Sequence, residues 1–311
     1  MQFFGINFNV INPQNFQKGL QLIQESIVTP EHFYSADNII TWNRNFTFLQ
    51  DKKFIKTVQE NSNTDVELSI IWRTYILCHF AKMTTHLKGD FVEIGAYKGN
   101  TANIILTMSG IEHTNKNYYL YDTFEHQEGD LNHAMPEHSA DLFNKVQKRF
   151  ECYPFVKVIK GYVPQSFDKG FPEAIAFAHI DLNQAPAELA ALNAVLPKLV
   201  PGGAIVLDDY GWWYYREQKN TQDPVLAAHG LSALELPTGQ GIVIKPFADS
   251  DSDSTPPPPA ILKYCFFLLL FLYEKHSHHR CHWFCWFAFA CLVGRAWYSC
   301  AFNSAQKNKF I

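Results

Sequence analysis

The main body of this chain has few cysteines, no excess of positive charge and no long apolar run. Only Cys78 and Cys152, of seven cysteines, precede residue 250, so a disulfide scaffold is excluded and a reduced intracellular fold is expected. The net charge of −4 gives no attraction to phosphate backbones, so nucleic acid is not an expected partner. No apolar run reaches the roughly 18 to 20 residues of a spanning helix, which argues against a membrane partner.

The amino-terminal residues 1–7 lack the basic flank and continuous apolar stretch of a secretory signal. We therefore expect a cytoplasmic protein. A hydrophobic fraction of 47% over 311 residues is enough for a substantial buried core. Such a globular, mildly acidic chain favours a small polar ligand.

Residues 1–248 divide into two regions by pattern. Apolar residues at helical spacing near 16–27 and 67–83 predict a helical amino-terminal lead-in or cap over residues 1–85. Residues 86–248 alternate short apolar runs with amphipathic stretches, which predicts an α/β, Rossmann-like fold with a mostly parallel sheet and helices on both faces. The expected strands are 91–94, 118–122, 156–159, 176–181, 204–208 and 241–244.

The carboxyl-terminal part differs in composition from the rest of the chain. Residues 249–260 are an Asp/Ser/Pro linker, and residues 261–311 form an atypical hydrophobic tail rich in cysteine and histidine. Cys281 and Cys285 with nearby histidines offer zinc ligands, but the paired CxxC blocks of strong zinc signatures are absent. The abrupt change favours read-through or shifted-frame translation over a functional domain.

A glycine turn follows the first strand of the α/β region. Glu93 lies on that strand, and Gly95 and Gly99 lie in the turn that leads to the next helix. Glycines permit a tight turn and a close backbone approach, while the helix amino terminus offers free N–H groups, so this turn suits a nucleoside-type cofactor. An ordinary strand-to-helix connection uses the same residues, and the motif alone leaves both readings open.

A second acidic position strengthens the cofactor hypothesis. Asp122 ends the next strand, where a carboxylate can accept hydrogen bonds from both ribose hydroxyls. Capping of the following segment is the structural alternative for Asp122.

Three further aspartates, Asp181, Asp208 and Asp209, lie at the expected carboxyl ends of two strands, the ligand-binding edge of such a sheet. They repel one another unless something neutralises them, and a hard cation such as Mg²⁺ takes oxygen ligands of this kind. Asp208 or Asp209 could instead cap the next turn. We expect Arg73, on a helix of the lead-in, to be a solvated arginine.

Five ordered motifs resemble the macrocin O-methyltransferase family, a branch of the class I S-adenosylmethionine-dependent methyltransferases. The resemblance extends over roughly residues 65–246, including a closing Pro-Thr-Gly-Gln-Gly at 237–241. The five motifs are Glu-Ile-Gly-Ala-Tyr-Lys-Gly at 93–99, Leu-Tyr-Asp-Thr-Phe-Glu at 120–125, Lys-Gly-Tyr-Val-Pro at 160–164, His-Ile-Asp-Leu-Asn at 179–183 and Pro-Gly-Gly-Ala-Ile-Val-Leu-Asp-Asp-Tyr-Gly at 201–211.

The resemblance implies a class I methyltransferase fold and specific roles for these residues. Asp122 would bind the ribose of S-adenosylmethionine, and Asp181, Asp208 and Asp209 would bind magnesium. The other expected cofactor residues are Glu93, Gly95, Gly99 and Gly161. One departure from the family is His126, which stands where a glycine is usual and leaves the loop beside the ribose in doubt.

The resemblance implies an O-methyltransferase that acts on a hydroxyl of a small sugar-like or secondary-metabolite substrate, including a glycoside. Asp181 and His179 are the candidate general bases, although a strand histidine is more often a core residue. A homo-oligomer is compatible with the sequence. Three alternatives stay open: a metal-independent methyltransferase, an NAD-binding Rossmann-type oxidoreductase, and a binding protein without turnover.

Overall fold

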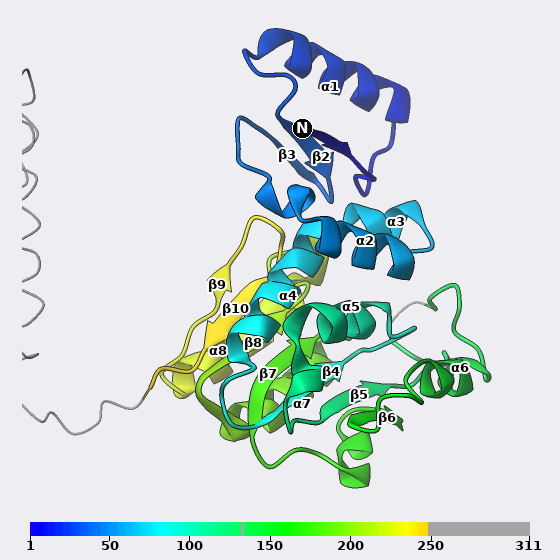
Figure 1. Cartoon of the computed structure of the whole chain (residues 1–311), viewed down its shortest axis with the longest axis vertical. Helices are drawn as coiled ribbons and strands as arrows, with labels where there is room; N and C mark the ends of the chain where they lie inside the picture. The colour runs from blue at the N-terminus through cyan, green and yellow to red at the C-terminus, as the bar shows by residue number, and fades with distance from the viewer. Residues whose placement is uncertain (132–133, 248–311) are drawn as a thin grey trace, which may run out of the picture. The chain divides into compact units, whose positions relative to one another are not determined.

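A seven-stranded sheet forms the centre of the chain in the computed structural model, which describes residues 1–131 and 134–247 (Figure 1). The strand order is β6-β5-β4-β7-β8-β10-β9. The first five strands of that order are parallel, and β10 runs antiparallel to both of its neighbours. Strands β5 and β6 are added on one side of β4, and β7 and β8 on the other, so the strand order switches between β4 and β7. Doubly wound sheets bind their ligands at such a switch point. The strands are β4 (Asp90–Ile94), β5 (Tyr118–Asp122), β6 (Val156–Lys160), β7 (Ile175–Ile180), β8 (Leu199–Leu207), β9 (Leu234–Glu235) and β10 (Gly241–Ile244).

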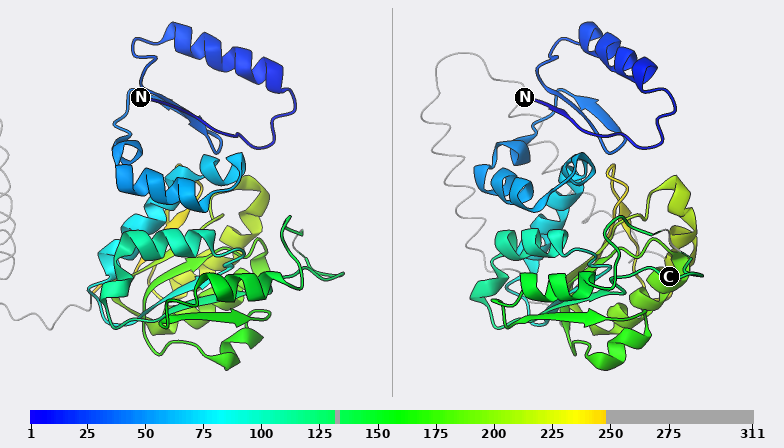
Figure 2. Two further views of the ribbon diagram at one scale, coloured as in Figure 1. Left: turned by 45° about the vertical axis from the view of Figure 1, so that its right-hand side comes forward. Right: turned by 90° about the vertical axis from the view of Figure 1, so that its right-hand side faces the viewer.

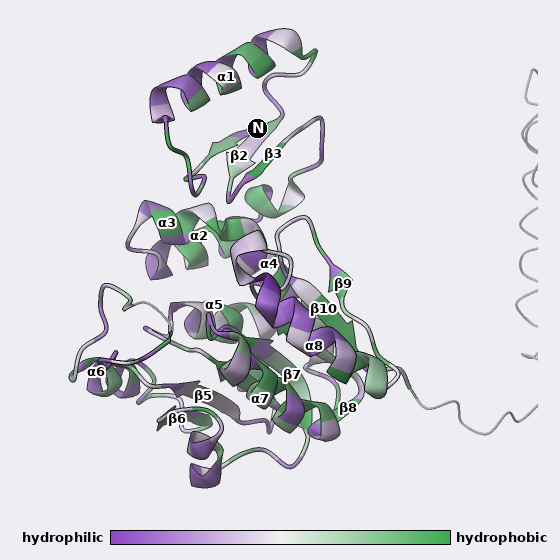
Figure 3. Ribbon diagram, turned by 180° about the vertical axis from the view of Figure 1, so that it is seen from behind, coloured by the Kyte–Doolittle hydropathy of each residue, from purple (hydrophilic) through white to green (hydrophobic). Residues whose placement is uncertain are grey.

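Helices cover both faces of this sheet, so its central strands are buried on both sides. Alternate residues of a strand enter two different cores: Phe91 packs in one core with helices α4 and α5, while Val92 packs in the other with α7 and α8. In Figure 3 the ribbon of β10 is largely hydrophobic, whereas α8 carries many hydrophilic residues. The helices are α4 (Ile71–Thr84), α5 (Asn100–Ser109), α6 (Leu142–Arg149), α7 (Ala185–Val195) and α8 (Arg216–Ala228).

The predicted α/β fold is therefore confirmed, including all six expected strands. The largest boundary difference is in β8, which begins at Leu199 and not at the expected 204, and so includes the Pro-Gly-Gly segment. A register shift between β7 and β8 accommodates this segment. The short strand β9 was not predicted, because its two residues are too few to show a periodic pattern.

The amino-terminal region contains the expected helices and also a small sheet that the sequence pattern did not reveal. Strand β2 (Phe33–Ala36) pairs in parallel with β1 (Gln2–Phe4) and antiparallel with β3 (Ile39–Trp42). Both views in Figure 2 show helix α1 (Pro13–Ser26) over this small sheet, on the side away from the seven-stranded sheet. Helices α2 (Lys52–Asn61) and α3 (Asp65–Ser69) lie between the two sheets (Figure 1).

The predicted linker and tail, and with them the zinc alternative at Cys281 and Cys285, lie outside the described residues. Within residues 1–131 and 134–247, no helix is both long enough and apolar enough to cross a membrane.

Candidate active site

A cavity of about 380 Å³ opens at the carboxyl ends of β4, β5 and β7, within the roughly 300 to 1,000 Å³ that small-molecule sites occupy. Four predicted site residues line it: Gly95, Asp122, Gly161 and Asp181. They lie at or just after the carboxyl ends of four strands, β4, β5, β6 and β7, and meet because the carboxyl ends of parallel strands share one edge of the sheet. The structure thus brings together most of the predicted cofactor site.

Gly95 allows two loops of this cavity to approach each other. Its φ is +103°, and a Cβ atom at this position would lie only 1.7 Å from the backbone oxygen of Asp181. The backbone N–H of Asp181 in turn donates a 2.8 Å hydrogen bond to Ile94 O. Glycine at position 95 is therefore required for Asp181 to reach the cavity wall.

Asp122 is held in place by the backbone of the neighbouring turns. Its Oδ2 accepts a hydrogen bond from Tyr97 N at 2.8 Å, and its Oδ1 accepts one from Phe124 N at 2.5 Å. Burial raises the pKa of Asp122, and these two hydrogen bonds oppose the rise. Each carboxylate oxygen keeps a second lone pair for a ligand. The capping and ribose-binding roles of Asp122 are therefore compatible.

Glu93 and Gly99 are placed differently from the other predicted cofactor residues. Glu93 is buried in the sheet, where its Oε2 accepts a 2.5 Å hydrogen bond from Tyr118 Oη. Gly99 caps helix α5 with a φ of +71°, and a Cβ atom there would lie 2.7 Å from the ring of Phe150. Neither residue is part of the described cavity wall. Contact of either residue with a cofactor remains a prediction, whereas their packing roles are visible.

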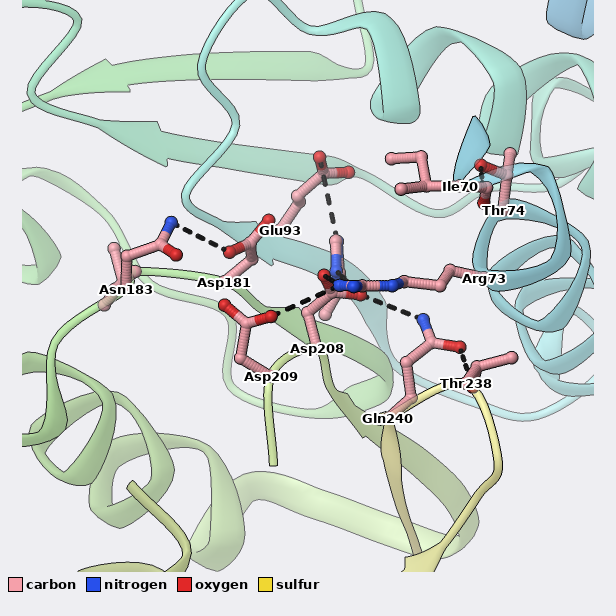
Figure 4. Close-up of polar contacts among 12 residues, drawn as sticks. Ile70, Arg73, Thr74, Glu93, Asp181, Asn183, Asp208, Asp209, Thr238 and Gln240 are labelled. Carbon is pink, nitrogen blue, oxygen red and sulfur yellow. Dashed lines mark hydrogen bonds and ion pairs between the residues drawn. The ribbon is translucent and has the colours of Figure 1, made fainter. Parts of the chain in front are cut away.

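Asp208 and Asp209 follow β8 and face a buried arginine, so the expectation that Arg73 is solvated is wrong. Arg73 is 8% exposed, and its Nη1 donates to Asp208 Oδ2 at 2.9 Å and to Asp209 Oδ1 at 3.2 Å. Figure 4 shows the arginine reaching these aspartates from the helix opposite. The sequence pattern missed this contact because 135 positions separate Arg73 from Asp208.

The two neighbouring aspartates differ in their electrostatics. Burial would raise the pKa of Asp208, but Arg73 and His179 outweigh it and hold that pKa below its ordinary value. For Asp209, burial and the charge of Asp208 dominate over Arg73 and raise the pKa to about 7. Burial, Asp208 and Asp209 also raise the pKa of Asp181 well above its ordinary value. Asp181, Asp208 and Asp209 form an acidic cluster, and its positive charge is too small to offset its carboxylates even with Arg73 beside them.

His179 lies 2% exposed between two carboxylates. Its Nδ1 is 3.8 Å from Glu93 Oε1 and its Nε2 is 3.6 Å from Asp208 Oδ1, which are ion-pair rather than hydrogen-bond distances. Burial lowers the pKa of His179, but both carboxylates raise it more, and the net effect is a pKa well above the ordinary value. The ring is buried, as expected of a strand histidine in the core, and it faces a carboxylate on each side.

A divalent cation fits this group of side chains. Ligand atoms of His179, Asp181 and Asp208 lie within 4.8 Å of one another, and neither nitrogen of the buried His179 ring has a hydrogen-bond partner in the described part of the chain. Imidazole and carboxylate ligands are common for divalent metals. Asp209, which was also predicted as a metal ligand, is not in this group of described residues, and its Oδ1 accepts a hydrogen bond from Arg73.

Two residues of the site escaped the sequence analysis. Gln240, named only as part of the closing motif, is fully buried and donates from Nε2 to Asp208 Oδ1 at 2.9 Å. Asp37, from the turn between β2 and β3, binds Arg73 through both carboxylate oxygens. Nothing in the local pattern around Asp37 distinguishes it from an ordinary turn aspartate.

A larger cavity of about 580 Å³ lies between β1 and helices α2 and α3. Its wall is mainly apolar and contains none of the predicted site residues. We therefore assign the chemistry to the smaller cavity and the adjoining acidic cluster.

Comparison with known proteins agrees with this placement. Residues 92–210 match the family model described as a methyltransferase domain, and this range contains all the predicted catalytic, cofactor and metal residues. No curated protein matches the chain. Residues 92–210 therefore carry a methyltransferase domain.

Solved structures that resemble the chain are distant. The O-methyltransferase NovP is 16% identical with a TM-score of 0.48, covering 60% of this chain and 83% of NovP. CalS11, a TDP-rhamnose 3'-O-methyltransferase of calicheamicin biosynthesis, is 15% identical with a TM-score of 0.47, covering 76% of this chain and 97% of CalS11. The S-adenosylhomocysteine-bound PaMTH1 from Podospora anserina is 12% identical with a TM-score of 0.43, covering 78% of this chain and all of PaMTH1.

Proposed function

We propose that the chain is a divalent-cation-dependent O-methyltransferase of the macrocin O-methyltransferase type, acting on a hydroxyl of a small sugar-like molecule. The observation that carries the proposal is the position of Asp181. It lines the cofactor cavity, and it also belongs to the group of side chains that can hold a cation. A methyl donor in the cavity and an acceptor hydroxyl at the acidic cluster would therefore meet beside one residue.

The cofactor end of the site needs donors and acceptors at fixed positions. Asp122 supports binding of a ribose, because its carboxylate is oriented by Tyr97 N and Phe124 N. Gly161, with a φ of +149°, lines the same cavity as Gly95. Pre-alignment of donor and acceptor in such a cavity supplies much of the acceleration of a direct methyl transfer.

The acceptor end contains His179, Asp181 and Asp208 as the proposed cation ligands, with Asp209 beside them. A bound Mg²⁺ would act as a Lewis acid that lowers the pKa of the substrate hydroxyl. Of the two candidate bases, Asp181 is favoured for accepting the hydroxyl proton, because it reaches the cavity while His179 is buried behind it. The hydroxyl oxygen then attacks the sulfonium methyl group, the methyl carbon–sulfur bond breaks, and S-adenosylhomocysteine leaves.

Aromatic side chains that follow Asp209 in the sequence support a sugar-like acceptor. Trp213 and Tyr214, in the segment that follows Asp209, are 73% and 71% exposed. Exposed aromatic rings of this kind offer apolar faces on which a sugar ring can stack. The net charge and the acidic cluster favour a neutral or cationic acceptor over an anionic one.

The test is methyl transfer from methyl-labelled S-adenosylmethionine to a panel of glycosides and other hydroxyl compounds, with Mg²⁺ and with EDTA. We expect transfer in Mg²⁺ and loss of turnover in EDTA, while S-adenosylhomocysteine still binds. Asp208→Asn should act like EDTA, because an amide keeps the shape but removes the charge that a hard cation favours. Full activity in EDTA, with elemental analysis showing no bound metal, would establish the metal-independent alternative.

A further inference from the structure

Arg73 connects the acidic cluster to a part of the chain that precedes the methyltransferase domain. Its guanidinium uses three nitrogens: Nε donates to Asp37 Oδ2 at 2.7 Å, Nη2 donates to Asp37 Oδ1 at 2.8 Å, and Nη1 is shared by Asp208 and Asp209. Arg73 thus holds one oxygen of each neighbouring aspartate. The other oxygen of Asp208 accepts the Gln240 hydrogen bond and faces His179.

Asp37 is built into the amino-terminal sheet. It lies in the turn between β2 and β3 with a φ of +52°, and it is 2% exposed. Its backbone N–H donates to Ile6 O at 2.8 Å, which ties the turn to the segment after β1. A carboxylate so placed, away from water, holds a guanidinium in one orientation.

An aromatic ring also packs against the Arg73 guanidinium. The Arg73 guanidinium carbon lies 4.8 Å from the centre of the Trp212 ring. The ring of Phe8, another amino-terminal residue, packs edge-on against Trp212 with centroids 6.0 Å apart. Arg73 is therefore fixed by side chains of the amino-terminal sheet region and of the loop that follows Asp209.

We propose that Arg73 is a positioning residue for the cation-binding carboxylates and that Asp37 anchors it, so that the amino-terminal sheet is part of the reaction site. This inference rests on the proposed function. The planar fork of arginine binds Asp37 bidentately and still reaches Asp208 and Asp209, which the single ammonium of lysine cannot do. The three carboxylates are therefore held by the geometry of the guanidinium and not by its charge alone.

The experiment measures Mn²⁺ binding by electron paramagnetic resonance and S-adenosylhomocysteine binding by calorimetry, on the full chain. Arg73→Lys keeps the charge but loses the fork, and we expect it to weaken Mn²⁺ binding by about tenfold or more, the usual effect of losing a partner of a metal ligand. Asp37→Asn should weaken Mn²⁺ binding by a smaller factor, about threefold. S-adenosylhomocysteine should bind all variants equally, because Arg73 and Asp37 are not part of the described cavity wall.

Arg149→Lys is the matched control. Arg149 also bridges several elements, since its guanidinium donates to Lys98 O, Asn100 Oδ1 and Asn61 Oδ1, but it has no contact with the acidic cluster. We expect this variant to bind Mn²⁺ like the wild type. If Arg73→Lys does not fold, as judged by circular dichroism, the Asp37→Asn result decides.

The outcomes separate this inference from the proposed function. Mn²⁺ affinity of Arg73→Lys and Asp37→Asn within twofold of the wild type would overturn the positioning role and leave the proposed function standing. A wild type that binds S-adenosylhomocysteine but no Mn²⁺ would overturn both the cation and the positioning role. A wild type that does not bind S-adenosylhomocysteine would overturn the methyltransferase proposal alone, and the Mn²⁺ comparison would still decide the role of Arg73.

Discussion

The cofactor cavity and the acidic cluster adjoin each other at Asp181 but are built in different ways. The cavity is made by backbone: glycines with positive φ at positions 95 and 161, and N–H groups that orient Asp122. The cluster is made by side chains from distant parts of the chain, with Arg73 and Asp37 arriving from the amino-terminal region. A site made by backbone can be recognised from short sequence motifs, whereas a site made by side chains from distant elements depends on the whole fold.

Gly95→Ala should have the largest effect on the backbone-built half. The added Cβ would lie 1.7 Å from Asp181 O, so the turn after β4 and the loop that contains Asp181 must move apart. We expect a loss of about 3 kcal/mol or more in the free energy of unfolding, measured with urea, together with loss of cofactor binding.

Gly110→Ala is the control for that prediction. Gly110 also has a positive φ, +77°, but no atom lies within 4 Å of the added Cβ. It should cost about 1 kcal/mol, the conformational part alone. Equal losses for the two variants would show that the close approach at Gly95 does not matter.

Glu188 should make the free energy of unfolding depend on pH. This fully buried residue of α7 accepts hydrogen bonds from Leu182 N at 3.1 Å and Gln222 Nε2 at 2.9 Å. Burial, with Asp209 and Asp208 adding to it, raises the pKa of Glu188 to about 8. Because the folded pKa lies above the unfolded one, Glu188 stabilises the fold below the unfolded pKa, and this contribution is lost as the pH rises toward 8.

Urea unfolding at pH 6 and pH 9 measures this loss. The wild type should lose about 2 kcal/mol more between these pH values than Glu188→Gln, which cannot ionise. Parallel pH profiles for the two proteins would mean that Glu188 is already ionised in the folded state.

Asp122→Asn should weaken cofactor binding without unfolding the protein. The amide keeps one acceptor oxygen but loses the charge and the second acceptor, so we expect S-adenosylhomocysteine to bind about tenfold more weakly by calorimetry. Asp90→Asn is the control, because Asp90 Oδ1 also accepts a backbone hydrogen bond, from Asn117 N at 2.8 Å, but at the opposite end of β4. A similar loss for both variants would assign Asp122 a purely structural role.

The smallest effect is expected from removing residues 248–311. The last described strand ends at Ile244, and every predicted site residue precedes it. A chain ending at Phe247 should keep its activity and melt within about 2 °C of the full chain, as a change below 0.5 kcal/mol would produce. A large drop in melting temperature or turnover would show that the tail contributes to the domain.

The sequence predicted six of the seven strands of the large sheet because strands buried on both faces leave near-continuous apolar runs. It also located Gly95, Asp122 and Asp181, since strand ends fix their position on one edge of the sheet, while Gly161 was expected from the family resemblance alone. The three-stranded amino-terminal sheet was missed because its strands have three or four residues each.

The arginine in the cluster could not be predicted for a physical reason. Helix α4 contacts β7 and β8, but no local pattern states which of its side chains turns inward. Arg73 was expected in solvent because an isolated buried cation is costly, and the three carboxylates that offset this cost come from two loops far away in sequence. Charge complementarity between distant elements becomes visible only in the folded chain.

The central claim is that the cavity at β4, β5 and β7 binds S-adenosylmethionine and not another nucleotide cofactor. Calorimetric titration of the full chain with S-adenosylhomocysteine and with NAD tests it directly, with Asp122→Asn measured in parallel. We predict binding of S-adenosylhomocysteine that weakens in the variant, and weaker or no binding of NAD. Tighter binding of NAD than of S-adenosylhomocysteine would contradict the assignment and favour the oxidoreductase alternative.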